Sequence, residues 1–109
     1  MKRGDVVVVA LSGDYGKPRP ALVVQSDLFN ETHASVTLAP VTSTIVDAPL
    51  FRLTLEPSSG TGLRSVSQIM VDKVTTVKRD RVDRTIGRIS DETLVRVNRA
   101  IALWFGLAA

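Results

Sequence analysis

The chain has 109 residues, no cysteine, a single histidine, and 14 lysines and arginines against 11 aspartates and glutamates. The length fits one domain spanning residues 1–109, and the lack of cysteine excludes disulfides, thiol nucleophiles and cysteine-based zinc sites. One histidine excludes His-rich metal centres, an aromatic content of 5% argues against a base-stacking platform, and the net charge of +3 favours polyanionic partners.

Hydropathy predicts no targeting or membrane-spanning segment. The apolar run Val6–Leu11 is too short for a signal sequence, and no run approaches the roughly 18–20 apolar residues that a membrane span needs. We therefore expect a soluble, cytoplasmic protein.

Short β-branched runs predict strands in the first three-quarters of the chain. The first run, Val6–Val9, is expected to be buried on both faces of a sheet. Further strands are expected over Ala21–Gln25, Ser35–Val41, Leu50–Glu56, Ser65–Val71, Lys73–Val77 and Thr85–Ile89. Glycine, proline and small polar residues predict loops at 11–18, 26–34 and 57–62, and a short helix or turn is expected at 79–82.

The hydrophobic period changes near residue 90. Ser90 followed by two acidic residues is typical of a helix N-terminus, where a hydroxyl caps the helix and the dipole favours negative charge. Leu94, Val97, Ile101 and Trp104 then recur on one helical face, and Gly106 is expected to end the helix. The predicted fold is mainly β: a small antiparallel barrel or strongly bent sheet closed by a C-terminal helix.

Arg19 is the first candidate functional residue. It stands between Pro18 and Pro20, at the start of an expected strand. A backbone fixed on both sides lowers the entropy lost when a guanidinium is presented to a ligand, and its planar donors match phosphate oxygens. Taken alone, the spacing also fits a surface arginine in a rigid turn.

Two polar clusters could act beside Arg19. The hydroxyls of Thr42-Ser43-Thr44 follow an apolar strand and could hydrogen-bond a phosphate, although small polar residues also form ordinary turns. Asp14, Tyr15 and Lys17 offer an acceptor, an aromatic ring and a cation in the preceding loop, which could equally be a solvated hairpin tip. The cations between Lys73 and Arg88 are interleaved with aspartates and indicate a solvated mixed-charge face.

Four segments, in this order, resemble the MazF/PemK (Kid) toxin family. They are Arg3-Gly4-Asp5 before the valine run, Gly16–Gln25 with its Arg-Pro pair, Leu38–Ser43 ending in Pro-x-Thr-Ser, and Ser67–Val77 with its Asp at position 72. The resemblance extends over nearly the whole chain. The chain departs from the family in the loop before Arg19, which is shorter than usual, and at Met70, where some members carry a second arginine.

The resemblance implies an SH3-like barrel with a C-terminal helix, acting as a homodimer and as the toxin of a type II toxin–antitoxin system. The implied activity is sequence-specific, ribosome-independent cleavage of single-stranded RNA without a metal or cofactor. By this resemblance the ribose 2′-OH attacks the adjacent phosphate and leaves a 2′,3′-cyclic phosphate and a 5′-OH end. The expected protein partner is an acidic cognate antitoxin.

The family's site residues can be carried over by position. Arg19 matches the catalytic arginine and is expected to stabilise the phosphorane, because a guanidinium with a pKa above about 12 is a poor base. Thr42 matches the catalytic threonine, and Asp14 is the candidate general base. The expected RNA-binding residues are Tyr15, Lys17, Ser43, Thr44, Gln68, Asp72 and Lys73.

A gyrase-poisoning toxin of the CcdB type is the main alternative, because it resembles this family in fold and has no nuclease activity. Its terminal helix ends in an aromatic-Trp-Gly-Ile segment, and Trp104-Phe105-Gly106-Leu107 is related but has the aromatic residues in the opposite order. Trp104 also simply continues the apolar helix face. The matches at Arg19 and Thr42 favour the nuclease, and a silent homologue that only binds its antitoxin is a third possibility.

Overall fold

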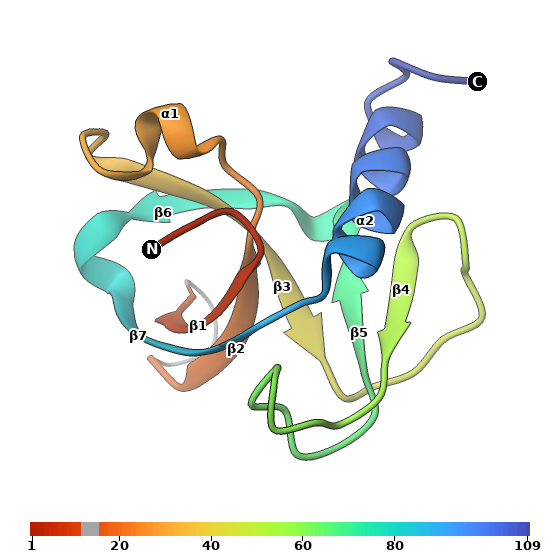
Figure 1. The fold of residues 1–109 in the computed structure, drawn as a ribbon, viewed down its shortest axis with the longest axis horizontal. Helices are drawn as coiled ribbons and strands as arrows, with labels where there is room; N and C mark the ends of the chain where they lie inside the picture. Colours follow the sequence, from red (N-terminus) through yellow and green to blue (C-terminus); the bar gives the residue numbers. More distant parts are fainter. Residues whose placement is uncertain (12–15) are drawn as a thin grey trace.

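The computed structural model describes residues 1–11 and 16–109 (Figure 1). The elements in chain order are β1 (Asp5–Ala10), β2 (Pro18–Val23), α1 (Asp27–Asn30), β3 (Ser35–Thr42), β4 (Arg52–Leu55), β5 (Ser67–Met70), η1 (Val71–Lys73), β6 (Thr75–Lys78), η2 (Arg79–Arg81), β7 (Val82–Arg88) and α2 (Asp91–Trp104). The recorded strand pairs are all antiparallel, in the order β4-β5-β3-β2-β1-β7, with β6 beside β3. The predicted fold class, a mainly β chain with a C-terminal helix, is confirmed.

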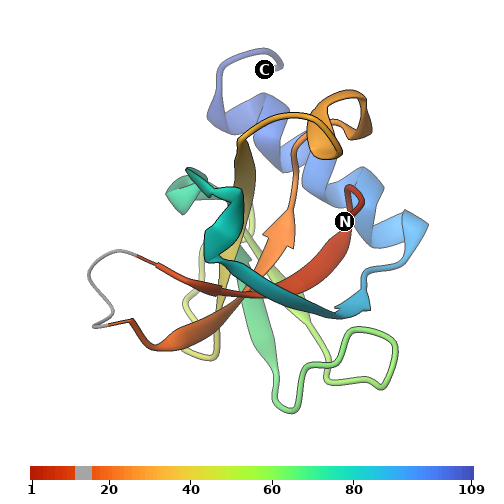
Figure 2. The same cartoon turned by 90° about the vertical axis from the view of Figure 1, so that its left-hand side faces the viewer.

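The sheet bends at β3, its longest strand. β3 pairs with β2 through residues 38–40, with β6 through 35–38 and with β5 through 41–42. In the side view the β1–β2 pair and the β4–β5 pair run in different directions (Figure 2). Thr42 therefore lies in the part of β3 that has left β2 and joined β5.

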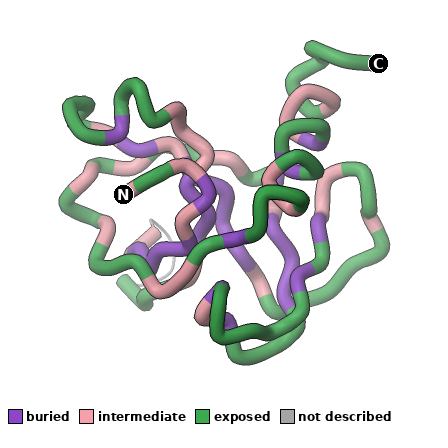
Figure 3. The backbone as a smooth tube through the Cα atoms, in the orientation of Figure 1, coloured by how far each residue is buried: buried purple, intermediate pink, exposed green. Residues whose placement is uncertain are grey.

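The buried residues, whose backbone is purple in Figure 3, form two apolar cores. In β1, Val6 packs in the larger core, whereas Val7 and Val9 pack in the smaller one, as the alternation of a strand requires. Val97 and Ala100 of α2 complete the larger core. The prediction that the valine run is buried on both faces is confirmed.

The structure differs from the prediction at β2 and at α1, among other element boundaries. β2 begins at Pro18 rather than Ala21, and its first three residues pair with β1 alone, so a missing proline N–H disrupts no bond to a second neighbour. A single helical turn, α1, occupies part of the expected 26–34 loop. Ser26 begins it, since its hydroxyl accepts a hydrogen bond from the Leu28 N–H at 3.2 Å.

β7 also begins earlier than expected, at Val82 rather than Thr85. It pairs with β1 over its whole length, with register shifts that leave Asp83 and Ile86 without a partner residue. The added residues bring Arg84 into the sheet.

Both ends of α2 follow the prediction. The Ser90 hydroxyl accepts a hydrogen bond from the Thr93 N–H at 3.1 Å, and Gly106 ends the helix with a φ of +75°. The Leu107 N–H donates to the carbonyl of Ala102 at 2.8 Å, as in a Schellman motif. No helix among the described residues is long and apolar enough to cross a membrane.

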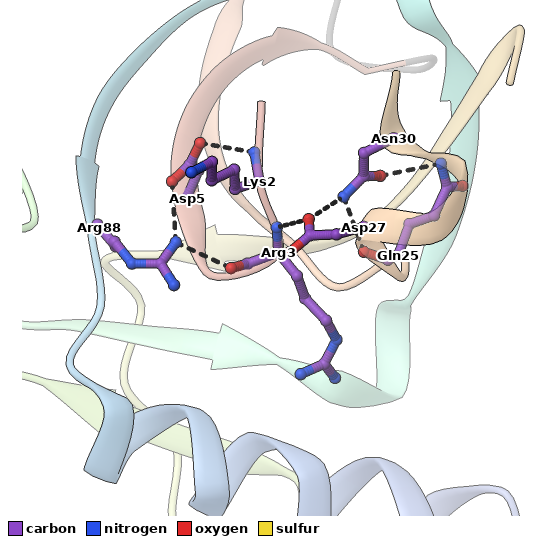
Figure 4. A network of polar contacts seen from close by, with 7 residues as sticks. All are labelled: Lys2, Arg3, Asp5, Gln25, Asp27, Asn30 and Arg88. Atoms are coloured by element: carbon purple, nitrogen blue, oxygen red, sulfur yellow. Dashed lines mark hydrogen bonds and ion pairs between the residues drawn. The ribbon is translucent and has the colours of Figure 1, made fainter. Parts of the chain in front are cut away.

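The Arg3-Gly4-Asp5 segment ties the start of the chain to α1 and β7 (Figure 4). The Asp27 carboxylate accepts hydrogen bonds from the Arg3 N–H at 2.7 Å and the Asn30 amide at 2.8 Å, and these donors hold the pKa of Asp27 below its usual value. The Arg88 guanidinium donates to the carbonyl of Arg3 at 2.9 Å and to the Asp5 carboxylate at 3.2 Å. This part of the family-like pattern therefore has a structural role.

Candidate active site

A hollow of about 780 Å³ opens beside β1, β2, β3 and β7. Its polar lining consists of hydroxyls and guanidinium groups, from Thr42, Ser43, Thr44, Ser65 and Ser67 and from Arg19, Arg64 and Arg84. None of its described lining residues is acidic. Three arginines among these lining residues favour an anionic ligand.

The floor of the hollow is apolar. Val8 of β1 pairs with Pro20 on one side and with Arg84 on the other, so these three side chains share one face of the sheet. Val8 and Pro20 line the hollow together with Pro40 and Leu63. A ligand with both a flat apolar part and an anionic part, such as a nucleotide, matches this combination of floor and rim.

Arg19 and Thr42 reach the hollow from neighbouring strands. Arg19 is an exposed residue of β2, opposite Val9 of β1, and lies between the two prolines that fix its backbone. Thr42 is the last residue of β3, and its hydroxyl accepts a hydrogen bond from the Thr44 N–H at 3.1 Å. A hydroxyl that accepts one hydrogen bond still carries a proton that it can donate to a ligand.

The turn at residues 58–64 is fixed against β7 by close backbone contacts. A Cβ on Gly62, whose φ is +74°, would lie only 2.3 Å from the carbonyl oxygen of Ile86. A Cβ on Gly87 would lie 2.3 Å from the carbonyl carbon of Thr61. Only glycine permits these approaches, and they place the residues after Gly62 at the hollow.

Arg64 and Arg84 were not among the predicted site residues. Arg84 belongs to a run of mixed charges, which is typical of a solvated face. Arg64 follows a turn that packs against β7, a strand that is distant in sequence. The available signal was the glycine at position 87 inside a strand pattern, because such a glycine often marks a close backbone approach.

The other predicted site residues fall into three groups. Ser43 and Thr44 line the hollow with Thr42. Asp14 and Tyr15 lie outside the described residues. Lys17 is exposed next to β2 but is not part of the lining.

Gln68 and Asp72 make contacts within the fold instead. The buried Gln68 amide donates to the carbonyl of Val46 at 2.9 Å and to the Thr54 hydroxyl at 3.2 Å, and its oxygen accepts from the Val46 N–H at 3.1 Å. Asp72 accepts two hydrogen bonds from Arg52, at 2.7 and 3.0 Å. These bonds hold the pKa of Asp72 below its usual value.

Lys73, the remaining predicted residue, is exposed in η1 and does not line the hollow. Trp104, the aromatic residue that a gyrase poison would use, is half exposed. Its ring stacks on that of Phe51, with the ring centroids 5.5 Å apart. Within residues 1–11 and 16–109, no group of three or more His, Asp or Glu side chains could hold a metal ion.

Comparison with known proteins identifies the relatives of this chain. Residues 2–105 match the family described as "PemK-like, MazF-like toxin of type II toxin-antitoxin system". The chain is 47% identical over 109 residues to the "Probable endoribonuclease MazF" of Mycolicibacterium smegmatis, covering 99% of both chains. It is 28% identical to "Endoribonuclease EndoA" of Bacillus subtilis, over 98% of this chain and 96% of that protein.

Solved structures share the fold. An "Endoribonuclease in complex with its cognate antitoxin from Mycobacterial species" superposes with a TM-score of 0.83 at 24% identity, over 100% of this chain and 98% of that one. The "Mycobacterium tuberculosis toxin MazF-mt6" also gives a TM-score of 0.83, at 22% identity, over 96% and 99% of the two chains. The bent sheet with its terminal helix is therefore the architecture of these toxins.

Proposed function

Because this chain belongs to the PemK-like, MazF-like toxin family of type II toxin–antitoxin systems, we propose that its basic hollow cleaves single-stranded RNA through attack of a ribose 2′-OH. The chain is an endoribonuclease of the MazF type. The observation that carries the proposal is that Arg19 and Thr42, from β2 and β3, line one hollow with two further arginines.

The reaction exchanges one phosphorus–oxygen bond for another. The 2′-oxygen bonds to the adjacent phosphorus and loses its proton to a base, and the bond from phosphorus to the 5′-oxygen breaks as that oxygen gains a proton. The products are a 2′,3′-cyclic phosphate and a 5′-OH end, and no co-reactant is consumed. The reaction needs a base, an acid and positive charge at the phosphorane.

Arg19 stabilises the charge of the phosphorane in this scheme. Its guanidinium presents parallel N–H donors to the equatorial oxygens, and the prolines on either side reduce the backbone freedom lost on binding. Thr42 donates a hydrogen bond from its hydroxyl to the phosphate and orients it, and the leaving 5′-oxygen takes its proton from water. Asp14, five residues before Arg19, is the proposed base for the 2′-OH.

The proposed substrate and partners follow from the charge and the family. Single-stranded RNA binds the hollow across a homodimer, is read in a sequence-specific way and is cut without a ribosome or a metal ion. The cognate antitoxin is acidic and competes with RNA for the basic hollow. A relative solved in complex with its cognate antitoxin supports an antitoxin as the protein partner. The chain acts as one cytoplasmic domain.

Cleavage of a mixed RNA pool in EDTA tests the proposal. Purified protein should cut the pool at defined sequences, and sequencing of the 5′-OH ends should identify them. Arg19→Ala should abolish cleavage and Thr42→Val should slow it at least 100-fold, because each removes stabilisation specific to the transition state. RNA left intact by the wild-type protein, together with cleaved complexes on DNA gyrase, would overturn the proposal in favour of a gyrase poison.

A further inference from the structure

The two arginines that face the hollow from β7 and from the 58–64 turn have no part in the chemistry proposed above. Arg84 lies on β7, and Arg64 lies two residues after Gly62, whose backbone contacts Ile86 of the same strand. Arg84 lies two residues before Ile86, so each arginine is two residues away from the contact between Gly62 and Ile86. Both residues line the hollow, and this contact brings their backbones to its β7 side.

Arg19 reaches the hollow from a different strand. β1 lies between β2 and β7, and adjacent strands are about 4.8 Å apart, so the backbones at Arg19 and Arg84 are separated by roughly 10 Å. Val8 and Pro20 form apolar floor between these positions. The hollow therefore carries positive charge at two separate backbone positions with apolar surface between them.

Arg84 forms an ion pair with Asp83 at 2.6 Å, but this pair leaves Arg84 able to bind a phosphate. Both side chains are well exposed, 63% for Arg84 and 65% for Asp83. Exposed pairs contribute little because water screens them, so a phosphate can take the place of this carboxylate without a large loss. Asp83 is not part of the hollow's lining.

We propose that Arg64 and Arg84 form a second phosphate-binding subsite, which holds the RNA backbone at a nucleotide flanking the one that is cut. The inference rests on the proposed function, since it assigns a role in RNA binding to the same hollow. Arg19 and Thr42 act at the reacting phosphate, and the apolar floor accommodates the sugar and base between the two phosphates. The subsite contributes to RNA affinity and register, and leaves the chemical step to the other two residues.

Binding and cleavage must be measured separately to test this. The probe for binding is an RNA oligonucleotide carrying the mapped cleavage sequence, with 2′-O-methyl groups that prevent the attack. Arg64→Ala and Arg84→Ala should each weaken its binding about tenfold, as expected for loss of a hydrogen bond to a charged group. The slope of log affinity against log salt should fall by about 0.7 for each phosphate contact removed.

Steady-state cleavage of the unmodified oligonucleotide gives the second readout. Both alanine variants should raise KM about tenfold and leave kcat within twofold of the wild-type value, since uniform binding is lost. Arg64→Lys and Arg84→Lys keep the charge, so they should restore the salt slope. Arg96→Ala, on the exposed part of α2 and outside the lining, is the matched control and should change neither constant.

Two results would overturn the subsite. In the first, Arg64→Ala and Arg84→Ala bind the RNA probe with the same affinity and the same salt slope as Arg96→Ala. The other is a loss in kcat at unchanged KM, which would place these arginines in the chemical step. Either result, with wild-type cleavage intact and Arg19→Ala inactive, removes the subsite alone, whereas an inactive wild-type protein removes the proposed function.

Discussion

Replacing Gly62 with alanine is the sharpest test of how the hollow is built. The φ of +74° costs an L-residue about 1–2 kcal/mol. The new Cβ would also lie 2.3 Å from the carbonyl oxygen of Ile86, and the backbone shift that relieves this contact costs about 1–3 kcal/mol more. Together the two effects lower the free energy of unfolding by about 2–5 kcal/mol, out of roughly 5–15 kcal/mol for a domain of ordinary stability.

Urea unfolding followed by the fluorescence of Trp104, the chain's single tryptophan, measures this loss. Two other glycines separate the causes. Gly106 has a φ of +75°, and a Cβ added there would meet no atom within 4 Å. Gly106→Ala should therefore lose only the stability that the positive φ costs an alanine. Gly60→Ala has an ordinary φ and its nearest atom at 3.7 Å, so it should stay within about 0.5 kcal/mol of the wild type. A Gly62→Ala protein as stable as Gly60→Ala would refute the close contact between the turn and β7.

Three further predictions concern contacts elsewhere in the fold. The hydrogen bonds from Arg52 hold the pKa of Asp72 below its usual value. The stability that Asp72 contributes is therefore present above about pH 4 and lost as the pH falls through its folded pKa. Asp72→Asn should remove this part of the acid sensitivity in urea titrations between pH 3 and 7, and an unchanged pH profile of stability would contradict the prediction. Ser90→Ala should cost about 1 kcal/mol in the same assay by removing the helix cap, without slowing RNA cleavage; no loss of stability would show that the cap is unimportant. Phe51→Ala should shift the emission of Trp104 to longer wavelength, because the stacked ring is replaced by water, and an unshifted spectrum would argue against the stacking.

Local patterns predicted most of the fold, because the residues that specify each element are neighbours in sequence. The cap at Ser90, the spacing of Val97 and Ile101, and the valine run of β1 each carry their own signal. The single turn of α1 gave no such signal. The buried Asn30 amide, which bonds to Asp27 and to the backbone of Gln25, depends on contacts that a short polar segment does not reveal.

The candidate site was predictable only in part. Arg19 and Thr42 stand out by their sequence surroundings, and both line the hollow. Arg64 and Arg84 reach it through contacts between distant segments, which no local pattern encodes. The same limit explains Gln68, whose polar side chain looks available for a ligand in the sequence but bonds to the connection between β3 and β4 in the fold.

The pairing of β1 with β7 also determines when the enzyme can first exist. Asp5 and Arg88, which bond across this pair, are 83 positions apart in the chain. During synthesis Arg19 and Thr42 leave the ribosome before β7, the strand that carries Arg84 and contacts the 58–64 turn. Contacts between such distant segments form late and slowly in folding. A nascent chain that has emerged only as far as Thr42 therefore holds Arg19 and Thr42 without the completed hollow.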